Sequence, residues 1–178
     1  YSNIRASIQQ NHLLILNERL NEIESLLEQV AADASALAGR APALAFAEEA
    51  RSETDANPGS ASFSQFALQR DFLRLLGDRS GQYEQIRFVT VAGSVWTSVS
   101  NINGLLDTDL GLKPAELIGD RVFQSSLNSS RTTFGPITIR RDALGTSRIV
   151  MQAYAPVIDL TAGGEVIGVV EVTVSARP

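Results

Sequence analysis

The sequence predicts an α+β domain in which a long N-terminal helix packs on a five-stranded antiparallel sheet. Apolar residues in the first part of the chain recur at the three-to-four-residue spacing of amphipathic helices. In the later part the period changes to the two residues of strands, and Gly-containing turns separate the apolar runs. We therefore expect a helical region over residues 1–80 and a sheet region over residues 81–178, which together form one domain.

The first helix is predicted to run from Ser2 to about Gly39. Such a helix is roughly 55 Å long at about 1.5 Å per residue, longer than a small domain is wide. Its apolar residues alternate steps of three and four, the seam of a heptad repeat. They are Leu13, Leu16, Leu20, Ile23, Leu27, Val30, Ala34 and Leu37. The seam either packs entirely on the chain's own core or is shared with a partner helix, in which case a parallel homodimer is expected.

Two shorter helices and the strands follow the first helix. The helices are predicted in GRAPALAFAEEAR and SFSQFALQRDFLRLLGDR, with Ser62 or Ser64 as the N-cap of the second. The strands are YEQIRFVTV, VWTSVS, PITIRR, SRIVMQAYAPVI and VIGVVEVTVS, with a short helix in DRVFQSSLNSS. The last strand is apolar on nearly both faces, so both faces of the sheet need a cover. The early helices supply one cover and the segment 101–131 the other, with a cavity beneath it.

Composition argues against several classes of function. The net charge of −5 and pI of about 4.9 do not suit nucleic-acid binding, which needs a basic surface. The sequence has no Cys and one His, His12, so neither a zinc site nor a haem or flavin ligand is expected. Asp107, Asp109 and Asp120 form no recognised acid–base spacing, so we expect neither an enzyme nor a bound cofactor.

Four segments of the chain carry a resemblance to a known family. YEQIRFVTVAGSVWTSV is similar to its first hairpin, and GDRVFQSSL to its pocket-side helix, with Phe123 at the aromatic position. AYAPVID resembles a strand that ends in Pro-Val, and GGEVIGVVEVTV resembles the closing strand with its Gly-x-x-x-Gly-Val-Val pattern. The family is that of the extracytoplasmic Cache domains, which are PAS-like sensors of bacterial membrane receptors. The resemblance implies the single-module form and the strand order 2-1-5-4-3, with the last strand in the middle.

The resemblance also implies a function. The chain would be the ligand-sensing domain, periplasmic or extracellular, of a histidine kinase, chemoreceptor or diguanylate cyclase. The first helix and the last strand would carry the signal to membrane spans that flank this sequence. The amino-acid-binding subgroup has an Arg-x-Trp-Tyr pattern on the pocket helix. Here RVFQSS keeps Arg121 but lacks the Trp-Tyr pair, so an amino acid is not the expected ligand.

A ligand site is expected where the pocket helix faces the sheet. Its predicted residues are Arg121, Gln124, Ser125, Trp96, Arg140, Asp142 and Tyr154. Arg121 is the expected anchor for a small anionic organic molecule, because a guanidinium group binds a carboxylate through two parallel hydrogen bonds. Asp120 or Asp142 could instead supply an internal partner for Arg121. In the strand order above, Arg87 and Glu171 lie on neighbouring strands and are expected to form an ion pair.

Other functions stay open at this point. The chain could be a dimerisation and relay module whose pocket is degenerate and binds no ligand, in which case apolar side chains would fill the cavity. An enzyme and a cytosolic PAS domain with a cofactor are less well supported, because the sequence offers no recognised catalytic spacing or cofactor ligand near the pocket segment.

Overall fold

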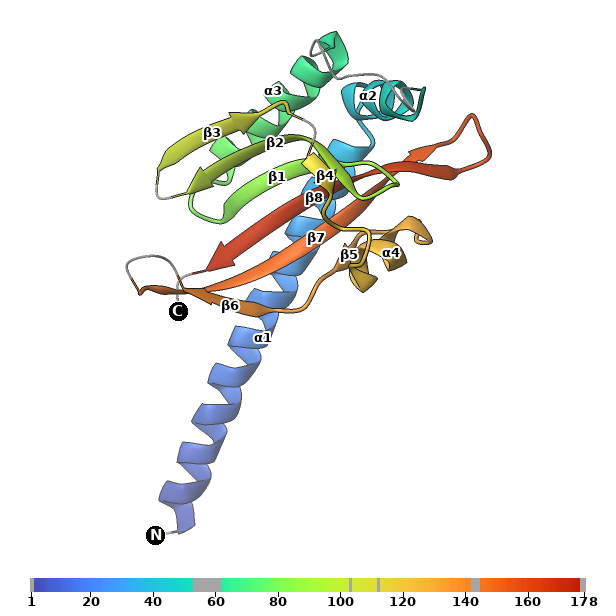
Figure 1. The fold of residues 1–178 in the computed structure, drawn as a ribbon. Helices are drawn as coiled ribbons and strands as arrows, with labels where there is room; N and C mark the ends of the chain where they lie inside the picture. The colour runs from blue at the N-terminus through green and yellow to red at the C-terminus, as the bar shows by residue number, and fades with distance from the viewer. Residues whose placement is uncertain (1, 53–61, 103, 112, 142–144, 177–178) are drawn as a thin grey trace.

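The computed structural model describes residues 2–52, 62–102, 104–111, 113–141 and 145–176. The helices are α1 (Ser2–Ala38), α2 (Ala41–Ser52), α3 (Phe63–Asp78) and α4 (Arg121–Leu127). The strands are β1 (Tyr83–Val89), β2 (Ser94–Ile102), β3 (Leu105–Asp109), β4 (Lys113–Ala115), β5 (Thr133–Phe134), β6 (Thr138–Arg141), β7 (Ser147–Asp159) and β8 (Glu165–Ala176). The expected α+β class is confirmed, with a long N-terminal helix beside an antiparallel sheet (Figure 1).

The sheet has the order β3-β2-β1-β8-β7-β5, with β4 paired to β2 and β6 to β7. The last strand, β8, lies between β1 and β7, and the five expected strands keep the predicted sequence of neighbours. The count of five strands is wrong, because the sheet has eight. β3 extends the sheet beyond β2 through a turn that contains Gly104, whose φ of 80° favours glycine. Part of the segment expected to cover the sheet therefore belongs to the sheet itself.

The main core lies between the sheet and the helices α1, α2 and α3, which share one face of the sheet (Figure 1). The ring of Phe46 on α2 packs edge-on against Phe88 on β1, with 5.0 Å between the ring centroids. Gly168 on β8 lies directly against the same ring, and a Cβ added there would be 2.5 Å from Phe88 Cζ. Only glycine allows this approach, so the Gly in the closing-strand motif has a packing role.

The seam of α1 divides into two halves. Val30, Ala34 and Leu37 are buried against the sheet and the other helices. The N-terminal half extends beyond the sheet (Figure 1), and the apolar side chains of its seam from Leu13 to Ile23 are exposed. These side chains are Leu13, Leu16, Leu20 and Ile23, each more than half exposed. The chain's own core therefore covers only the second half of the seam. Among the described residues, no helix has the length and apolar character needed to cross a membrane.

Polar contacts fasten α1 to the sheet near the start of β1. Asp33 accepts hydrogen bonds from Arg79 Nε at 2.8 Å, from Arg79 Nη2 at 3.1 Å and from the Tyr83 hydroxyl at 2.6 Å. The side chain of Gln29 on α1 donates to the side-chain oxygen of Gln82. The backbone carbonyl of Gln82 accepts a hydrogen bond from the backbone amide of Ser175 on β8. The turn before β1 thus contacts both α1 and the end of β8.

Candidate ligand site

A row of polar side chains crosses the face of the sheet opposite the three large helices. Residues paired between antiparallel strands lie side by side and point to the same face. The pairing register places five of them in sequence across β2, β1, β8, β7 and β5. They are Ser98, Arg87, Glu171, Tyr154 and Thr133. We call these five residues the polar row; it crosses a face that the sequence predicted to be nearly apolar.

Arg87 and Glu171 form the centre of the polar row. Arg87 Nε and Nη2 donate to Glu171 Oε2 at 3.0 and 2.8 Å, and Nη1 donates to Glu116 at 3.3 Å. The predicted cross-strand ion pair is therefore confirmed. Glu171 is only 1% exposed. Burial raises the pKa of the Glu171 carboxyl, and the neighbouring charge of Arg87 opposes this effect.

Several polar atoms near this ion pair have unused hydrogen-bonding capacity. Tyr154 is 3% exposed, and its hydroxyl has no hydrogen-bond partner among the described residues. Thr133 Oγ1, on the adjacent strand, is buried and also lacks a partner there. Glu171 Oε1 has only the hydroxyl of Thr173, at 3.5 Å. Buried polar groups without partners are costly, so these atoms make this part of the sheet a candidate ligand site.

The short helix α4 lies over this face. Asp120 caps it, because Oδ1 accepts from the amides of Val122 and Phe123 at 2.8 and 3.0 Å. The ring of Phe123 packs edge-on against Tyr154, 6.4 Å between centroids, in a small apolar cluster that includes Val169. Burial raises the pKa of Tyr154, and the negative charges of Glu171 and Asp120 raise it further. Both carboxylates therefore act electrostatically on the Tyr154 hydroxyl.

The structure places the predicted site residues of α4 away from the polar row. Arg121 is exposed and forms no ion pair among the described residues, so the expectation that its side chain turns toward the sheet is wrong. The reason is helical geometry: Phe123 faces the sheet, and a residue two positions earlier points about 200° away from it. Gln124 donates to the carbonyl of Ile118, and Ser125 is exposed. Asp120 bonds backbone amides of α4 rather than Arg121.

The predicted residues of the sheet are split between its two faces. Tyr154 lies on the α4 face, as expected. Trp96 lies on the opposite face, where its ring is 6.0 Å from that of Phe46, so its placement as a wall of the site is wrong. The pairing register shifts beside Phe88, which makes Trp96 the extra residue of a β-bulge and re-aims its side chain. Arg140 is exposed on β6, and its charge acts to lower the pKa of Tyr154.

Asp142, the remaining predicted site residue, lies outside the described residues. The polar row itself was missed because each of five strands contributes only one of its members. Only the register brings them together, and the single signal in the sequence was the Arg87–Glu171 pair.

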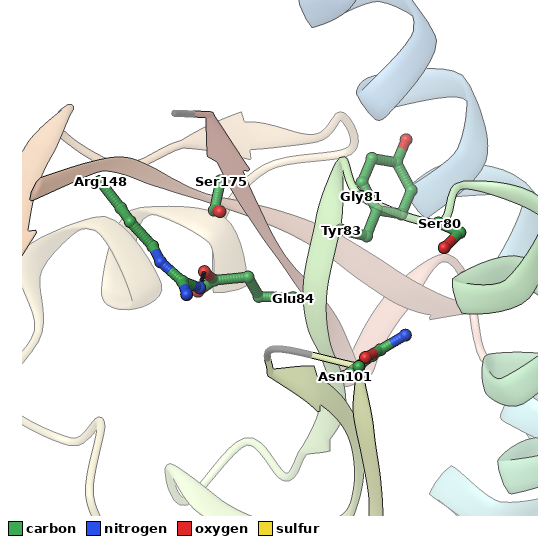
Figure 2. A pocket seen from close by; sticks show the side chains of 8 residues that line it. Ser80, Gly81, Tyr83, Glu84, Asn101, Arg148 and Ser175 are labelled. Carbon is green, nitrogen blue, oxygen red and sulfur yellow. Dashed lines mark hydrogen bonds and ion pairs between the residues drawn. The ribbon is translucent and has the colours of Figure 1, made fainter. Parts of the chain in front are cut away.

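A separate hollow of about 530 Å³ lies at the end of the sheet (Figure 2). It is lined by Ser80, Gly81, Tyr83, Glu84, Asn101, Gly104, Arg148 and Ser175. Figure 2 shows Arg148 reaching toward Glu84, and the two form an ion pair at 2.7 Å. Tyr83 turns its hydroxyl toward α1, where it meets Asp33. Charged groups pair internally in both places, but the polar row also contains Thr133 Oγ1, a buried hydroxyl without a partner among the described residues, so it is the stronger candidate for a ligand site.

No model of a protein family and no curated protein sequence matches the chain, so the comparison rests on structure. A domain of a protein assigned to the sensory box/GGDEF family of Vibrio parahaemolyticus aligns with a TM-score of 0.61 and 14% identity. The extracellular domain of a protein described as a histidine kinase gives the same values. These alignments cover 92% of this chain and 57% and 54% of the two structures.

The ligand-binding domain of a Campylobacter jejuni chemoreceptor, in complex with 4-methylisoleucine, aligns with a TM-score of 0.51 and 12% identity. That alignment covers 85% of this chain and 52% of the chemoreceptor domain. The chain thus spans a little more than half the length of these structures. The expected Cache-like fold is confirmed: the chain has the fold of extracellular sensory domains.

Proposed function

We propose that this chain is the extracytoplasmic ligand-sensing domain of a membrane signal-transduction receptor, and that residues 1–80 and 81–178 act as one unit. The fold it shares with extracellular sensory domains supports the proposal. The observation that carries it is the buried Thr133 Oγ1, which has no partner among the described residues, beside the largely buried Tyr154 on the face of the sheet that α4 covers. Its activity is binding rather than catalysis, and the output module lies elsewhere in the receptor.

The contacts around β8 suggest how binding is transmitted. Glu171 of the polar row lies four residues before Ser175, whose amide bonds the carbonyl of Gln82. Gln82 in turn binds Gln29 of α1 through its side chain. A ligand that changes the environment of Glu171 can thus alter the position of α1 relative to the sheet through a short chain of contacts. In the intact receptor, α1 and β8 would pass this shift to the flanking membrane spans.

The exposed half of the α1 seam supports a homodimer. Leu13, Leu16, Leu20 and Ile23 occupy the a and d positions of a heptad and are exposed. In a parallel pair, Arg19 at a g position faces Glu24 at the following e position of the partner helix, so the flanking charges are complementary. Two heptads are short, and the flanking spans would strengthen the association.

Cysteine crosslinking tests the dimer, and the absence of native Cys makes every crosslink report an engineered position. Single Cys substitutions along residues 10–24 of the membrane-embedded receptor should crosslink with a seven-residue period that peaks at the a and d positions. Equal crosslinking at all positions would contradict the parallel pair.

A thermal-shift screen of small metabolites tests the sensing function. A ligand at about 100 times its dissociation constant should stabilise the domain by about 2.7 kcal/mol. The double variant Tyr154→Phe, Thr133→Val should lose this response while keeping its stability, because isosteric removal of unpaired hydroxyls is nearly neutral. Ser125→Ala, a change of an exposed hydroxyl on the outer side of α4, is the matched control. If no compound shifts the wild type and the double variant is more stable, the domain is a ligand-free relay module.

A further inference from the structure

We infer that the ligand bound at the polar row is a small primary amine, a cation without a carboxylate of its own. This inference rests on the proposed sensing function and gives its ligand a chemical class. Two carboxylates, those of Glu171 and Glu116, pair with the guanidinium group of Arg87, and the negative charge of a third, Asp120, acts on Glu171 and on Tyr154. The charge of the exposed Arg140 also reaches Tyr154, yet the carboxylates still outnumber the cations. The site is therefore negative and favours a positively charged ligand.

Arg87 is not available to a ligand carboxylate. All three of its nitrogens already donate to carboxylates: Nε and Nη2 to the same oxygen of Glu171, Oε2, and Nη1 to Glu116. An anionic ligand would have to displace Glu171, which is 1% exposed and would be left as an unpaired buried charge. Arg121, the anchor expected from the sequence, points to solvent. Among the described residues, the one other cation whose charge reaches Tyr154 is Arg140, which is exposed on β6, so no buried guanidinium is available to the carboxylate of an acid or an amino acid.

The unused hydrogen-bonding capacity of the site matches an ammonium group. An ammonium has three donors and no acceptor, whereas a carboxylate only accepts. The atoms with spare capacity are mainly acceptors: Glu171 Oε1, with one contact at 3.5 Å, and the second carboxylate oxygen of Asp120, whose Oδ1 caps α4. The hydroxyls of Tyr154 and Thr133 can also accept. A primary ammonium group has three donors, so it can bond up to three acceptors of this kind.

A metal ion is a less suitable cation for this place. Among the described residues, no group of three or more His, Cys, Asp or Glu side chains has a metal-binding arrangement. The edge-on rings of Phe123 and Tyr154, together with Val169, offer an apolar surface for the carbon skeleton of an organic amine.

The experiment compares matched probes of one size on the 178-residue chain. Butylamine, butanoate, 2-aminobutanoate and 1-butanol, together with a panel of linear mono- and diamines, are tested by thermal shift and calorimetry at constant ionic strength. We expect the amines to raise the melting temperature and to bind by calorimetry, and the other three probes to have no effect. Failure of every amine to bind would overturn the inference.

Two variants with the same change of net charge locate the binding. Asp120→Asn keeps a good N-cap for α4 but removes the charge, and should weaken amine binding by roughly tenfold. Asp107→Asn removes an exposed carboxylate on β3 and should leave binding unchanged. Equal weakening by both variants, or by neither, would overturn the inference.

The results also separate this inference from the proposed function. Binding of butanoate or 2-aminobutanoate that is lost in Tyr154→Phe would overturn the amine but keep a ligand site at the polar row. If no probe or metabolite binds at all, both proposals fail.

Discussion

Replacing Arg87 with Met should destabilise the domain through the charge that it leaves behind. Met keeps the apolar stem of the arginine and removes its three contacts to Glu171 and Glu116. Glu116 is half-exposed and returns to water at little cost, whereas Glu171 is 1% exposed and is left near the negative charge of Asp120. Removal of one partner of such a buried pair costs about 3–5 kcal/mol.

The loss should depend on pH in a defined direction. Burial holds the pKa of Glu171 above its ordinary value of 4.5, and removal of Arg87 raises that pKa further. A carboxyl whose pKa is raised by folding stabilises the protein below the unfolded pKa, and this contribution is lost as the pH rises to the folded pKa. Between the unfolded and the folded pKa of Glu171, the free energy of unfolding should therefore fall by about 1.4 kcal/mol per pH unit. This pH range is wider in Arg87→Met than in the wild type, because the folded pKa is higher in the variant.

Urea denaturation of the wild type, Arg87→Met and Arg87→Met/Glu171→Gln at several pH values from about pH 5 to about pH 8 measures both effects. The single variant should be much less stable at the upper end, and the double variant should recover most of the loss and show no added pH dependence. The reasoning is refuted if the single variant has the same pH dependence as the wild type, or if the double variant is no more stable than the single one.

Three further changes test the fold. Gly168→Ala should lower the free energy of unfolding by about 1–3 kcal/mol, because the new methyl group meets the buried ring of Phe88. The control Gly77→Ala adds a methyl group in open space on α3 and should not lower it. Equal unfolding midpoints of the two variants in urea would contradict the close approach at Gly168. Burial acts to raise the pKa of Asp33, but the hydrogen bonds from Arg79 outweigh it and hold that pKa below its ordinary value. Ionised Asp33 therefore stabilises the fold at pH values above its unfolded pKa, and this stabilisation is lost as the pH falls. Asp33→Asn should flatten the acid limb of a stability–pH curve, and an unchanged limb would exclude this role. Ser62→Ala should lower the stability by about 1 kcal/mol through loss of the bond to the amide of Gln65, and no change in melting temperature would mean that the cap is unimportant.

The parts of the structure that the sequence predicted correctly depend on local periodicity or on strand order. The spacing of apolar residues is enough to predict most of α1, because the pattern repeats from Leu13 to Leu37. The Arg87–Glu171 ion pair required the order of strands, which the resemblance implied, and no side-chain geometry. The sequence left open whether the seam packs on the chain's own core or also on a partner helix, because periodicity identifies an apolar stripe but not what covers it.

The parts that it missed depend on single-residue shifts in register or rotation. One extra residue in β2 moves Trp96 to the opposite face of the sheet, and no rule for alternation in an unbroken strand anticipates that bulge. Arg121 was expected to face inward because it begins the helix, but the direction of α4 is set by Phe123, which is buried. The apolar spacing of the short strand β3 is also found in loops, and the Asn103-Gly104 pair, a typical hairpin turn, was the sequence signal that could have revealed it.

The position of β8 restricts how a ligand can produce a signal. Along most of its length β8 is hydrogen-bonded to β1 on one side and β7 on the other, so it cannot slide without breaking both ladders. Gly168 also fits closely against Phe88, which opposes movement along the strand. α1 instead rests on the sheet through side chains, with its polar contacts concentrated at Asp33, Gln29 and Ser35. If the proposed ligand binds at the polar row, we therefore expect it to shift α1 across the sheet rather than to displace β8 within it.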